Sequence, residues 1–387
     1  MPFYRRVGQV PRKRHLRVAQ PGGGYLYEEL MGAEGFSEDS ALLYHRSSPS
    51  ALVSAEAVRA PRAAACFETD LPLLPRHLRT GSLTRGGDPV LGRTPLLGNR
   101  DLTVSWVAAD ADSDLYRNAC GDELYYVYEG SARLESSFGA LAARAGDYLL
   151  VPTGTIHRWR VGADGVRLLV LEASGHVTFP ARYLSTNGQF LEGAPFSERD
   201  LRGPEEPPDE EGENVPVLVR TRAGLSRHVH AHHPFDVVGW DGCLYPCALS
   251  IFDFEPIVGA VHQPPPVHQT FAGPNFTVCS FVPRPYDFHP QALKVPYHHS
   301  NVDTDEVIFY AAGQFMSRSG SGIGAGSVSL HPAGFVHGPQ PGSVERAVDA
   351  TGTEEVAVMI DAFGRLGLSE EARRVADADY PWTWARA

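Results

Sequence analysis

The sequence predicts an all-β protein, and three observations carry that prediction. Glycine and proline are frequent, with 39 and 31 occurrences among 387 residues. Short runs of apolar and aromatic residues, such as those at 124–128 and 307–310, recur between turn signals. Long runs with the 3.6-residue period of an amphipathic helix are scarce. At roughly 100–200 residues per domain, the length predicts two or three domains built from short antiparallel strands.

The composition argues against several function classes. With 34 basic and 46 acidic residues the net charge is -12, which would repel a nucleic acid at long range. The sequence has no run of about 18 apolar residues and no apolar stretch of a secretory signal at its start. Its five cysteines are scattered without a Cys-x-x-Cys pair, as is typical of a reducing compartment. We therefore expect a cytoplasmic protein with no membrane and no nucleic-acid partner.

Along the chain, the sequence predicts four regions. Residues 1–100 are expected to form strands and loops that pack on a first β-domain at 101–200. Residues 201–225 are expected to be a linker, because acidic residues and prolines crowd this stretch. Residues 226–387 are expected to form a second β-domain. It should end in a short helix at 368–376, where acidic residues precede arginines as the helix dipole favours.

An internal repeat supports a division into two β-domains. Ten residues of the first half recur in the same order in the second half, at an offset of 183 residues for four pairs and 180 for six. Such regular matches indicate a duplicated domain with a three-residue difference in one loop. The pairs are Asn118 and Asn301, Asp122 and Asp305, Glu123 and Glu306, Gly130 and Gly313, Ala145 and Ala325, Gly146 and Gly326, Leu150 and Leu330, Pro152 and Pro332, Gly154 and Gly334, and His157 and His337.

The spacing within the repeat resembles the two motifs of the cupin superfamily. In cupins, two hairpins of a jelly-roll barrel, a double-stranded β-helix, carry metal ligands inward. The C-terminal copy offers His299, Glu306 and His337 at the ligand positions. The N-terminal copy keeps Glu123 but has Tyr116 in place of the first histidine. We therefore expect an all-β bicupin with short helices, in which only the C-terminal copy carries a complete metal site.

Two metals suit these ligand types. Two histidines and one carboxylate form the facial triad that holds non-haem Fe(II) and leaves positions open for substrate and dioxygen. Zinc also accepts this ligand set with an open position. Residue types alone do not separate the two metals.

Other histidines near the motifs are candidates for accessory roles. His331 stands where the N-terminal copy has Val151, and we expect it to contact the substrate or to support a metal ligand. His298 should point to the opposite face of the chain from His299. A general base for a phenol hydroxyl would have to come from the isolated histidines, which are His262, His268 and His289.

A second histidine group lies at 227–233. Alternation along a strand would place His228, His230 and His232 on one face, which is a geometry able to bind a metal. No carboxylate or cysteine at ligand spacing accompanies them. We therefore expect a surface or interface position for this group, with metal binding as the alternative.

Longer segments resemble the homogentisate 1,2-dioxygenase family. The resemblance touches nearly the whole chain and is strongest between His233 and Pro339. The segments that carry it are 26–32, 43–46, 233–242, 281–284, 296–306, 326–331 and 337–339.

The resemblance implies a site and a reaction. The implied Fe(II) ligands are His299, Glu306 and His337, and the implied substrate contacts are Tyr297, His331 and His337. His262 stands where the family has the histidine that accepts a substrate hydroxyl proton, and the alternative is His268 in a similar Val-His-Gln sequence. The implied reaction opens the homogentisate ring with O2 to give maleylacetoacetate in tyrosine and phenylalanine breakdown. The implied assembly is a homo-oligomer based on trimers, up to a hexamer.

Departures from the family pattern leave alternatives open. Phe315 stands where the animal enzymes carry a second tyrosine, so gentisate or another hydroquinone is an alternative substrate. One residue is inserted between Asn301 and Glu306. A zinc cupin isomerase or hydrolase and a metal-free binding protein are alternatives from other classes. The sequence does not indicate which residue binds the substrate carboxylate.

Overall fold

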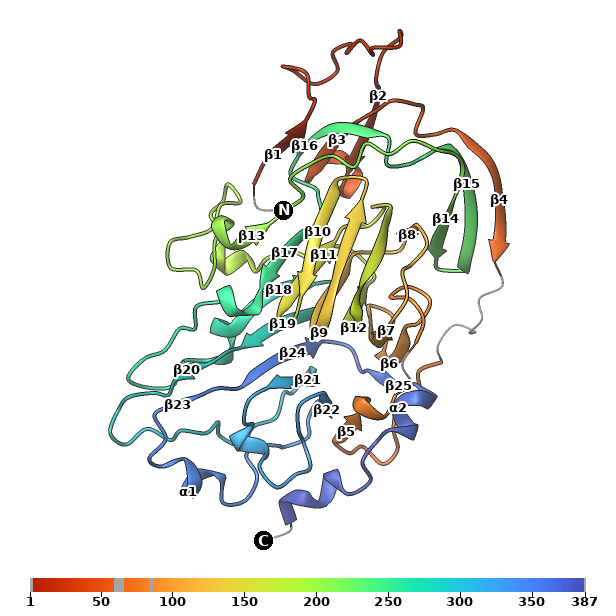
Figure 1. Ribbon diagram of the computed structural model, residues 1–387. Coiled ribbons are helices and arrows are strands. Elements are labelled where there is room, and N and C mark those ends of the chain that lie inside the picture. Colours follow the sequence, from red (N-terminus) through yellow and green to blue (C-terminus); the bar gives the residue numbers. More distant parts are fainter. Residues whose placement is uncertain (1–2, 59–65, 84–85, 386–387) are drawn as a thin grey trace.

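The computed structural model describes residues 3–58, 66–83 and 86–385, and strands dominate it (Figure 1). The described α-helices are α1 (Ser343–Ala347) and α2 (Glu370–Arg374). The predicted C-terminal helix is confirmed as α2, where the Ser369 hydroxyl accepts a hydrogen bond from the Ala372 N–H at 3.0 Å. None of the described helices is long and apolar enough to cross a membrane.

Short 3-10 helices join many of the strands. They are η1 (Glu34–Phe36), η2 (Thr80–Ser82), η3 (Ala181–Tyr183), η4 (Glu198–Asp200), η5 (Ile251–Asp253), η6 (Pro265–His268), η7 (Met316–Arg318) and η8 (Tyr380–Ala385).

The largest sheet has 13 strands and contains the first copy of the repeat (Figure 1). Its main path is β13-β17-β11-β9-β12-β8-β14-β15-β4. The strands are β4 (Leu52–Val58), β6 (Thr94–Gly98), β7 (Leu102–Ala109), β8 (Tyr116–Asn118), β9 (Glu123–Ser136), β10 (Gly139–Arg144), β11 (Asp147–Val151), β12 (His157–Ala173), β13 (Leu201–Arg202), β14 (Glu213–Thr221), β15 (Gly224–His232), β17 (Cys247–Ser250) and β25 (Gly367–Leu368).

A six-stranded sheet contains the second copy, in the order β18-β19-β24-β21-β22-β5. Its strands are β5 (Arg76–Arg79), β18 (Gln269–Gly273), β19 (Phe276–Phe281), β21 (Asp305–Ala312), β22 (Ser327–His331) and β24 (Val356–Ala362). A four-stranded sheet holds β1 (Arg5–Gly8), β2 (Tyr27–Gly32), β3 (Ser40–His45) and β16 (Val237–Gly242). The pair β20 (Arg284–Pro285) and β23 (Gly352–Thr353) completes the strands.

The sheets divide the chain differently from the boundaries expected at 100, 200 and 225. Residues 201–225 include β13, β14 and the start of β15, so the strand-free part of the expected linker is the acidic stretch 203–212 and the short turn 222–223. Strands β15 and β17 of the expected second domain pair with the first sheet, whereas β5 of the N-terminal region pairs with the second. Composition located the polar loop but could not show where the strand Glu213–Thr221 finds its partners, because strand pairing depends on residues far away in the chain.

Both copies of the repeat make the same backbone contacts. The N–H of Gly154 donates to Asn118 O at 2.9 Å, and the N–H of Gly334 donates to Asn301 O at 2.6 Å. Asp122 and its counterpart Asp305 each accept backbone N–H groups from the two following segments, at 2.8–2.9 Å. The shared glycines have positive φ in both copies, a conformation that favours glycine. They are Gly130, Gly146, Gly154, Gly313, Gly326 and Gly334.

The core lies between the two sheets and inside each barrel. Phe309 of β21 lies 5.8 Å from Trp106 and 6.0 Å from Tyr126, ring centre to ring centre, across the contact between the copies. Successive side chains alternate between the faces of a strand. The neighbouring positions of β21 therefore point into the barrel, where Ile308 and Tyr310 form a separate cluster. This alternation also turns Glu306 inward.

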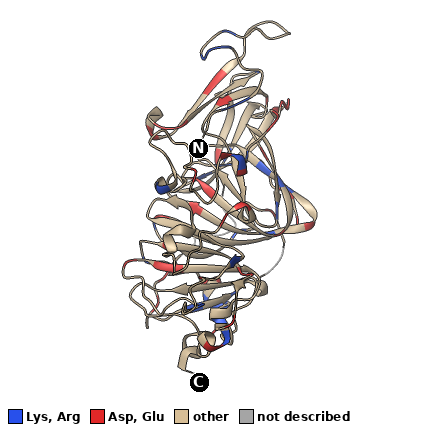
Figure 2. Cartoon of the chain, turned by 90° about the vertical axis from the view of Figure 1, so that its left-hand side faces the viewer, with Lys and Arg blue, Asp and Glu red and all other residues tan. Residues whose placement is uncertain are grey.

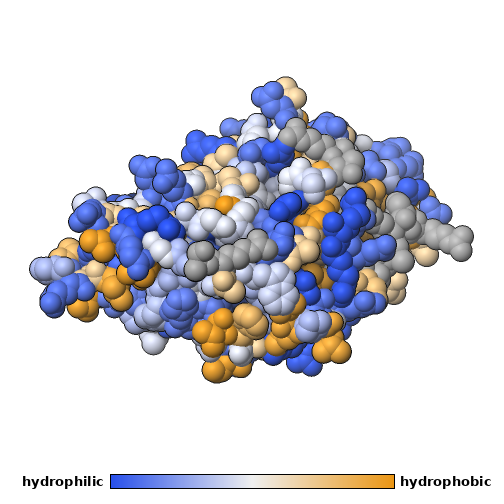
Figure 3. All heavy atoms as spheres, turned by 90° about the horizontal axis from the view of Figure 1, so that it is seen from below, coloured by the Kyte–Doolittle hydropathy of each residue, from blue (hydrophilic) through white to orange (hydrophobic). Residues whose placement is uncertain are grey.

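Charged residues of both signs are interspersed along the chain in Figure 2, with no continuous basic face in that view. The end that holds the C-terminus shows hydrophobic and hydrophilic residues side by side (Figure 3).

Candidate metal centre

The structure brings His299, Glu306 and His337 together. One ligand atom from each lies within 4.8 Å of the others, and these three are the only such group among the described residues. Glu306 Oε1 lies 3.2 Å from His337 Nε2, and Glu306 Oε2 lies 3.6 Å from His299 Nε2. The two histidines face each other because their backbones exchange hydrogen bonds of 2.8 and 2.9 Å.

Backbone carbonyls orient both imidazole rings. His299 Nδ1 lies 3.1 Å from Tyr297 O, and His337 Nδ1 lies 3.0 Å from Phe335 O. An Nδ1–H that donates to a carbonyl leaves Nε2 with a free lone pair, as a metal ligand requires. His337 Nε2 is buried and makes no aligned hydrogen bond. This unpartnered atom beside a carboxylate fits a site built for a divalent metal.

The electrostatics of the centre favour an ionised carboxylate. Burial would raise the pKa of Glu306, but its contacts with His299, His331 and His337 lower it well below its usual range. The contact with Glu306 raises the pKa of His299 in turn.

His331 lies behind Glu306 and is fully buried. Its Nδ1 is 2.8 Å from Glu306 Oε1, and its Nε2 is 2.9 Å from the hydroxyl of Tyr380. Burial and the nearby Arg318 lower the pKa of His331 to about 3, so the ring is neutral. Both ring nitrogens are thus occupied, which favours the ligand-supporting role over the substrate contact. Sequence reasoning missed Tyr380, which lies 49 residues away.

The open side of the centre carries Tyr297 and His262. Tyr297 is 56% exposed, and its ring lies 5.2 Å from that of His262 and 6.1 Å from that of His299. His262 is also exposed, and its Nδ1 lies 3.7 Å from Asp287 Oδ2. His268 differs because it is buried against Phe281, and burial lowers its pKa to about 3.

The remaining histidines of the region lie outside the ligand group. His289 and His298 are exposed.

Phe315, which differs from the tyrosine of the animal enzymes, is buried and packs edge-on against Tyr310 at 4.9 Å, ring centre to ring centre.

Asp361 is a second carboxyl group that sequence reasoning missed. It stands opposite Glu306 in the pairing of β21 with β24 and accepts a hydrogen bond from Asn301 Nδ2 at 3.2 Å. Burial and the charge of Glu306 raise the pKa of Asp361 to about 7. The repeat of identical residues did not include this position, because the N-terminal counterpart opposite Glu123 is Glu172, a different residue type.

In the N-terminal copy, a buried arginine contacts the glutamate that corresponds to Glu306. Arg93 Nη1 lies 2.6 Å from Glu123 Oε1 and 2.9 Å from Glu172 Oε1. The hydroxyl of Tyr116, which replaces the first ligand histidine, donates to the same Glu123 oxygen at 2.9 Å. Burial would lower the pKa of Arg93, but Glu123 and its other partners raise it well above the usual range. The guanidinium therefore supplies a positive charge where the other copy has ligand atoms.

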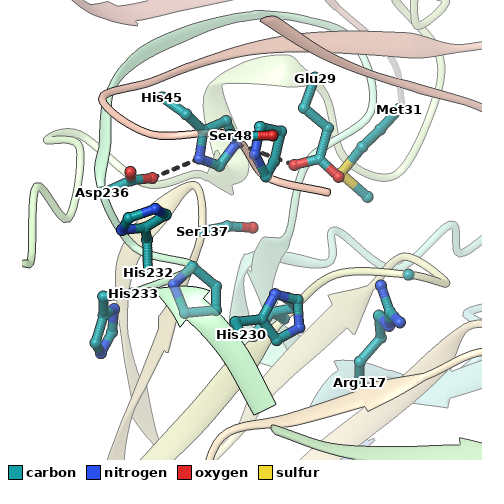
Figure 4. Close-up of a pocket in the computed structure, with 14 residues that line it drawn as sticks. Glu29, Met31, His45, Ser48, Arg117, Ser137, His230, His232, His233 and Asp236 are labelled. Carbon is teal, nitrogen blue, oxygen red and sulfur yellow. Dashed lines mark hydrogen bonds and ion pairs between the residues drawn. The ribbon is translucent and has the colours of Figure 1, made fainter. Parts of the chain in front are cut away.

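The second histidine group borders a pocket between β15 and β3. His230, His232 and His233 line it together with Glu29 and His45 (Figure 4). The sequence predicted a surface or interface position for this group. His230 and His233 are buried within the chain, so a surface position was wrong for these two, whereas His232 is exposed. The metal alternative gains no support, because the described residues hold no second close group of ligand atoms.

His45 forms an ion-paired triad at this pocket. Its Nδ1 lies 2.6 Å from Asp236 Oδ1 and its Nε2 lies 3.0 Å from Glu29 Oε2 (Figure 4). Burial would lower the pKa of His45, but these two hydrogen bonds and the charges of the two carboxylates raise it to about 9. The ring is therefore an imidazolium at neutral pH.

This triad predicts a loss of stability in alkali. Because the pKa is raised in the folded state, the contribution is fully present below about pH 6.5 and is lost as the pH rises through about 9. The shift corresponds to about 3 kcal/mol of the free energy of unfolding. Denaturant unfolding at pH 6 and pH 10 should show this loss, and His45→Gln should remove most of it. An equal loss in the variant would contradict the assignment.

Comparison with known proteins places these observations in a family. A protein-family model that is described as homogentisate 1,2-dioxygenase N-terminal matches residues 97–251. A Saccharolobus solfataricus protein with a provisional dioxygenase name is 39% identical over 390 residues, covering 99% of both chains. Homogentisate 1,2-dioxygenase of Emericella nidulans is 26% identical over 318 residues, covering 76% of this chain and 66% of its own.

Solved structures include a cupin 2 conserved barrel domain protein from Leptotrichia buccalis. It is 10% identical, has a TM-score of 0.35, and covers 74% of this chain and 96% of its own. The sequence relatives carry the assignment: the chain belongs to the homogentisate 1,2-dioxygenase family.

Proposed function

We propose that this protein is an Fe(II)-dependent dioxygenase that opens a hydroquinone-type ring with O2, converting homogentisate to maleylacetoacetate in tyrosine and phenylalanine breakdown. The observation that carries the proposal is the group His299, Glu306 and His337 in a chain of this family. Bound Fe(II) would supply open positions for a substrate hydroxyl and for O2.

The ligand set also fits the charge of the substrate. Two neutral imidazoles and one carboxylate leave a divalent ion with one positive charge, which attracts a phenolate. Tyr297 and His262 stand on the open side, where a bound ring would lie. His331 contributes from behind, because its hydrogen bond holds Oε1 of Glu306.

We assign the proton-accepting role to His262 rather than His268. His262 is exposed beside Tyr297, on the side where a substrate hydroxyl would lie, and its Nδ1 is 3.7 Å from the Asp287 carboxylate. His268 is buried with a strongly lowered pKa and lies against Phe281, so it cannot reach a substrate at the open side.

This assignment predicts a rate effect. His262→Gln should lower kcat by about 10²- to 10⁴-fold, the usual contribution of a positioned base, while metal content stays unchanged. His289→Gln is the matched control, since His289 is also exposed but has no contact with the centre. Steady-state O2 uptake measures the rates, and equal rates for both variants would exclude His262 as the base.

We also propose a trimer-based homo-oligomer in the cytoplasm. Apolar side chains flank the metal ligands on the outside, where Val302 is 83% and Val336 64% exposed in the single chain. Such exposed residues beside a site favour cover by another subunit. No disulfide links the five cysteines within the described residues, in keeping with a reducing compartment.

The first test of the proposal is O2 consumption by anaerobically purified, Fe(II)-loaded protein. Stoichiometric uptake with homogentisate is expected, together with the absorbance of an enol product. Uptake with gentisate alone would keep the reaction and change the substrate, the alternative that Phe315 leaves open. Tight zinc binding with activity that is independent of O2 would overturn the dioxygenase proposal in favour of a zinc isomerase or hydrolase.

A further inference from the structure

A chain of buried hydrogen bonds connects Arg318 to the carboxylate of Glu306. Arg318 Nε donates to the Tyr310 hydroxyl at 3.0 Å, and that hydroxyl lies 3.1 Å from Ser329 Oγ. Ser329 also interacts with the Tyr380 hydroxyl. Tyr380 then contacts His331 Nε2 at 2.9 Å, and His331 Nδ1 contacts Glu306 Oε1 at 2.8 Å.

The two ends of this chain fix the direction of every hydrogen bond. A guanidinium can only donate, and an ionised carboxylate can only accept. Each hydroxyl between them has one proton, so each accepts from the arginine side and donates toward Glu306. His331 must therefore carry its proton on Nδ1 and accept from Tyr380 at Nε2. No member is more than 6% exposed, so water does not compete for these bonds.

Hydrogen bonds that all point the same way in a buried setting polarise one another. Here the polarised hydrogen bonds and the positive charge of Arg318 stabilise the negative charge on a single oxygen of Glu306, Oε1. Glu306 Oε2, which faces His299, takes no part in the chain. The chain can thus stabilise the ionised carboxylate and fix its rotation without blocking its other oxygen.

The N-terminal copy shows the contrast. There the arginine itself contacts the glutamate, with Arg93 Nη1 at 2.6 Å from Glu123 Oε1. That copy has Val151 at the position of His331, so it cannot form the same connection. Each glutamate has a buried arginine nearby. Arg93 contacts Glu123 directly, whereas Arg318 is connected to Glu306 through other side chains, which leaves the side of Glu306 that faces His299 open.

The C-terminal segment supplies the central member of the chain. Tyr380 begins η8, and the segment before it is tied to β5 by an ion pair of 2.7 Å between Arg79 and Asp377. Farther along η8, Trp384 Nε1 donates to Gly338 O at 3.0 Å, next to the ligand His337. These contacts hold Tyr380 in place.

We propose that Tyr380 is a positioning residue of the metal centre, which orients Glu306 for metal binding through His331 as part of the chain that begins at Arg318. The inference rests on the proposed role of Glu306 as a metal ligand. Partners of this outer kind change metal affinity by about 10- to 100-fold in known metal sites.

The test compares Tyr380→Phe with Thr383→Val in the full-length protein. Both remove a buried hydroxyl from η8, but that of Thr383 bonds to Gln340 Nε2 and to Tyr380 O, outside the chain. The dissociation constant for Co(II) is measured anaerobically against a chromophoric chelator, and the visible spectrum of bound Co(II) reports the ligand geometry. Tyr380→Phe should bind about 10- to 100-fold more weakly with an altered spectrum, and Thr383→Val should match the wild type.

A second variant separates a specific effect on metal binding from a folding defect of Tyr380→Phe. Ser329→Ala interrupts the chain one step farther out and should weaken Co(II) binding in the same direction by a smaller factor. Equal affinities and spectra for Tyr380→Phe, Ser329→Ala and Thr383→Val would overturn the role of Tyr380. Absence of Co(II) binding by the wild type is a different result, which would overturn the proposed metal centre itself.

Discussion

Replacing Glu306 with glutamine should abolish both metal binding and O2 uptake with homogentisate. The substitution keeps the size of the side chain but removes the only carboxylate of the ligand group. The amide also presents an NH2 group to one of its three histidine neighbours. Loss of partners one step removed from a metal costs about 10- to 100-fold in affinity, so loss of a direct anionic ligand should cost more.

Metal content after anaerobic loading and an oxygen electrode measure the two effects of Glu306→Gln. Glu355→Gln is the control, because Glu355 is a half-buried acid of the same barrel whose partner is Arg284 at 3.2 Å. It should retain metal and activity. Full metal content in Glu306→Gln would remove Glu306 from the ligand group and with it the proposed centre.

The ligand group could be predicted from the sequence because the repeat fixes strand positions. Glu306 is the second residue of β21, and the alternation of that strand turns it into the barrel, as β9 does with Glu123 in the first copy. The glycines with positive φ mark the same turns in both copies, which brings His337 back beside His299. Local sequence rules therefore determined the geometry of these three residues.

The surroundings of the ligands could not be predicted in this way. Tyr380 reaches His331 from the end of the chain, and Arg93 reaches Glu123 from a segment before the repeat begins. Neither residue belongs to a motif with regular spacing, and neither is unusual in composition. The pairing of β5 with β22 could not be predicted either, since it joins residues about 250 positions apart. Such contacts arise from the tertiary fold, where side chains distant in sequence fill the interior.

The largest effect on stability is expected at Arg93. Arg93→Met keeps much of the side-chain volume but leaves Glu123 buried without its arginine, whereas Glu172 still pairs with Arg220 at 3.0 Å. Breaking a buried ion pair by removing one partner costs about 3–5 kcal/mol, because the remaining charge is uncompensated. Urea unfolding should show this decrease in the free energy of unfolding. Arg133→Met in β9 is the control, since Arg133 is exposed and its pairing with Glu135 should contribute little.

A double variant separates charge from packing at this position. Glu123→Gln removes one of the two carboxylates, so Arg93→Met combined with Glu123→Gln should be less destabilised than the sum of the single variants.

The pH dependence of the free energy of unfolding should also report the charge of this pair. Burial would raise the pKa of Glu123, but Arg93 lowers it below the usual range. A carboxylate with a lowered pKa stabilises the fold above its unfolded pKa, and this contribution is lost as the pH falls through the folded one. The difference in the free energy of unfolding between wild type and Arg93→Met should therefore shrink in acid. A difference that stays constant at all pH values would show that Arg93 acts through packing alone.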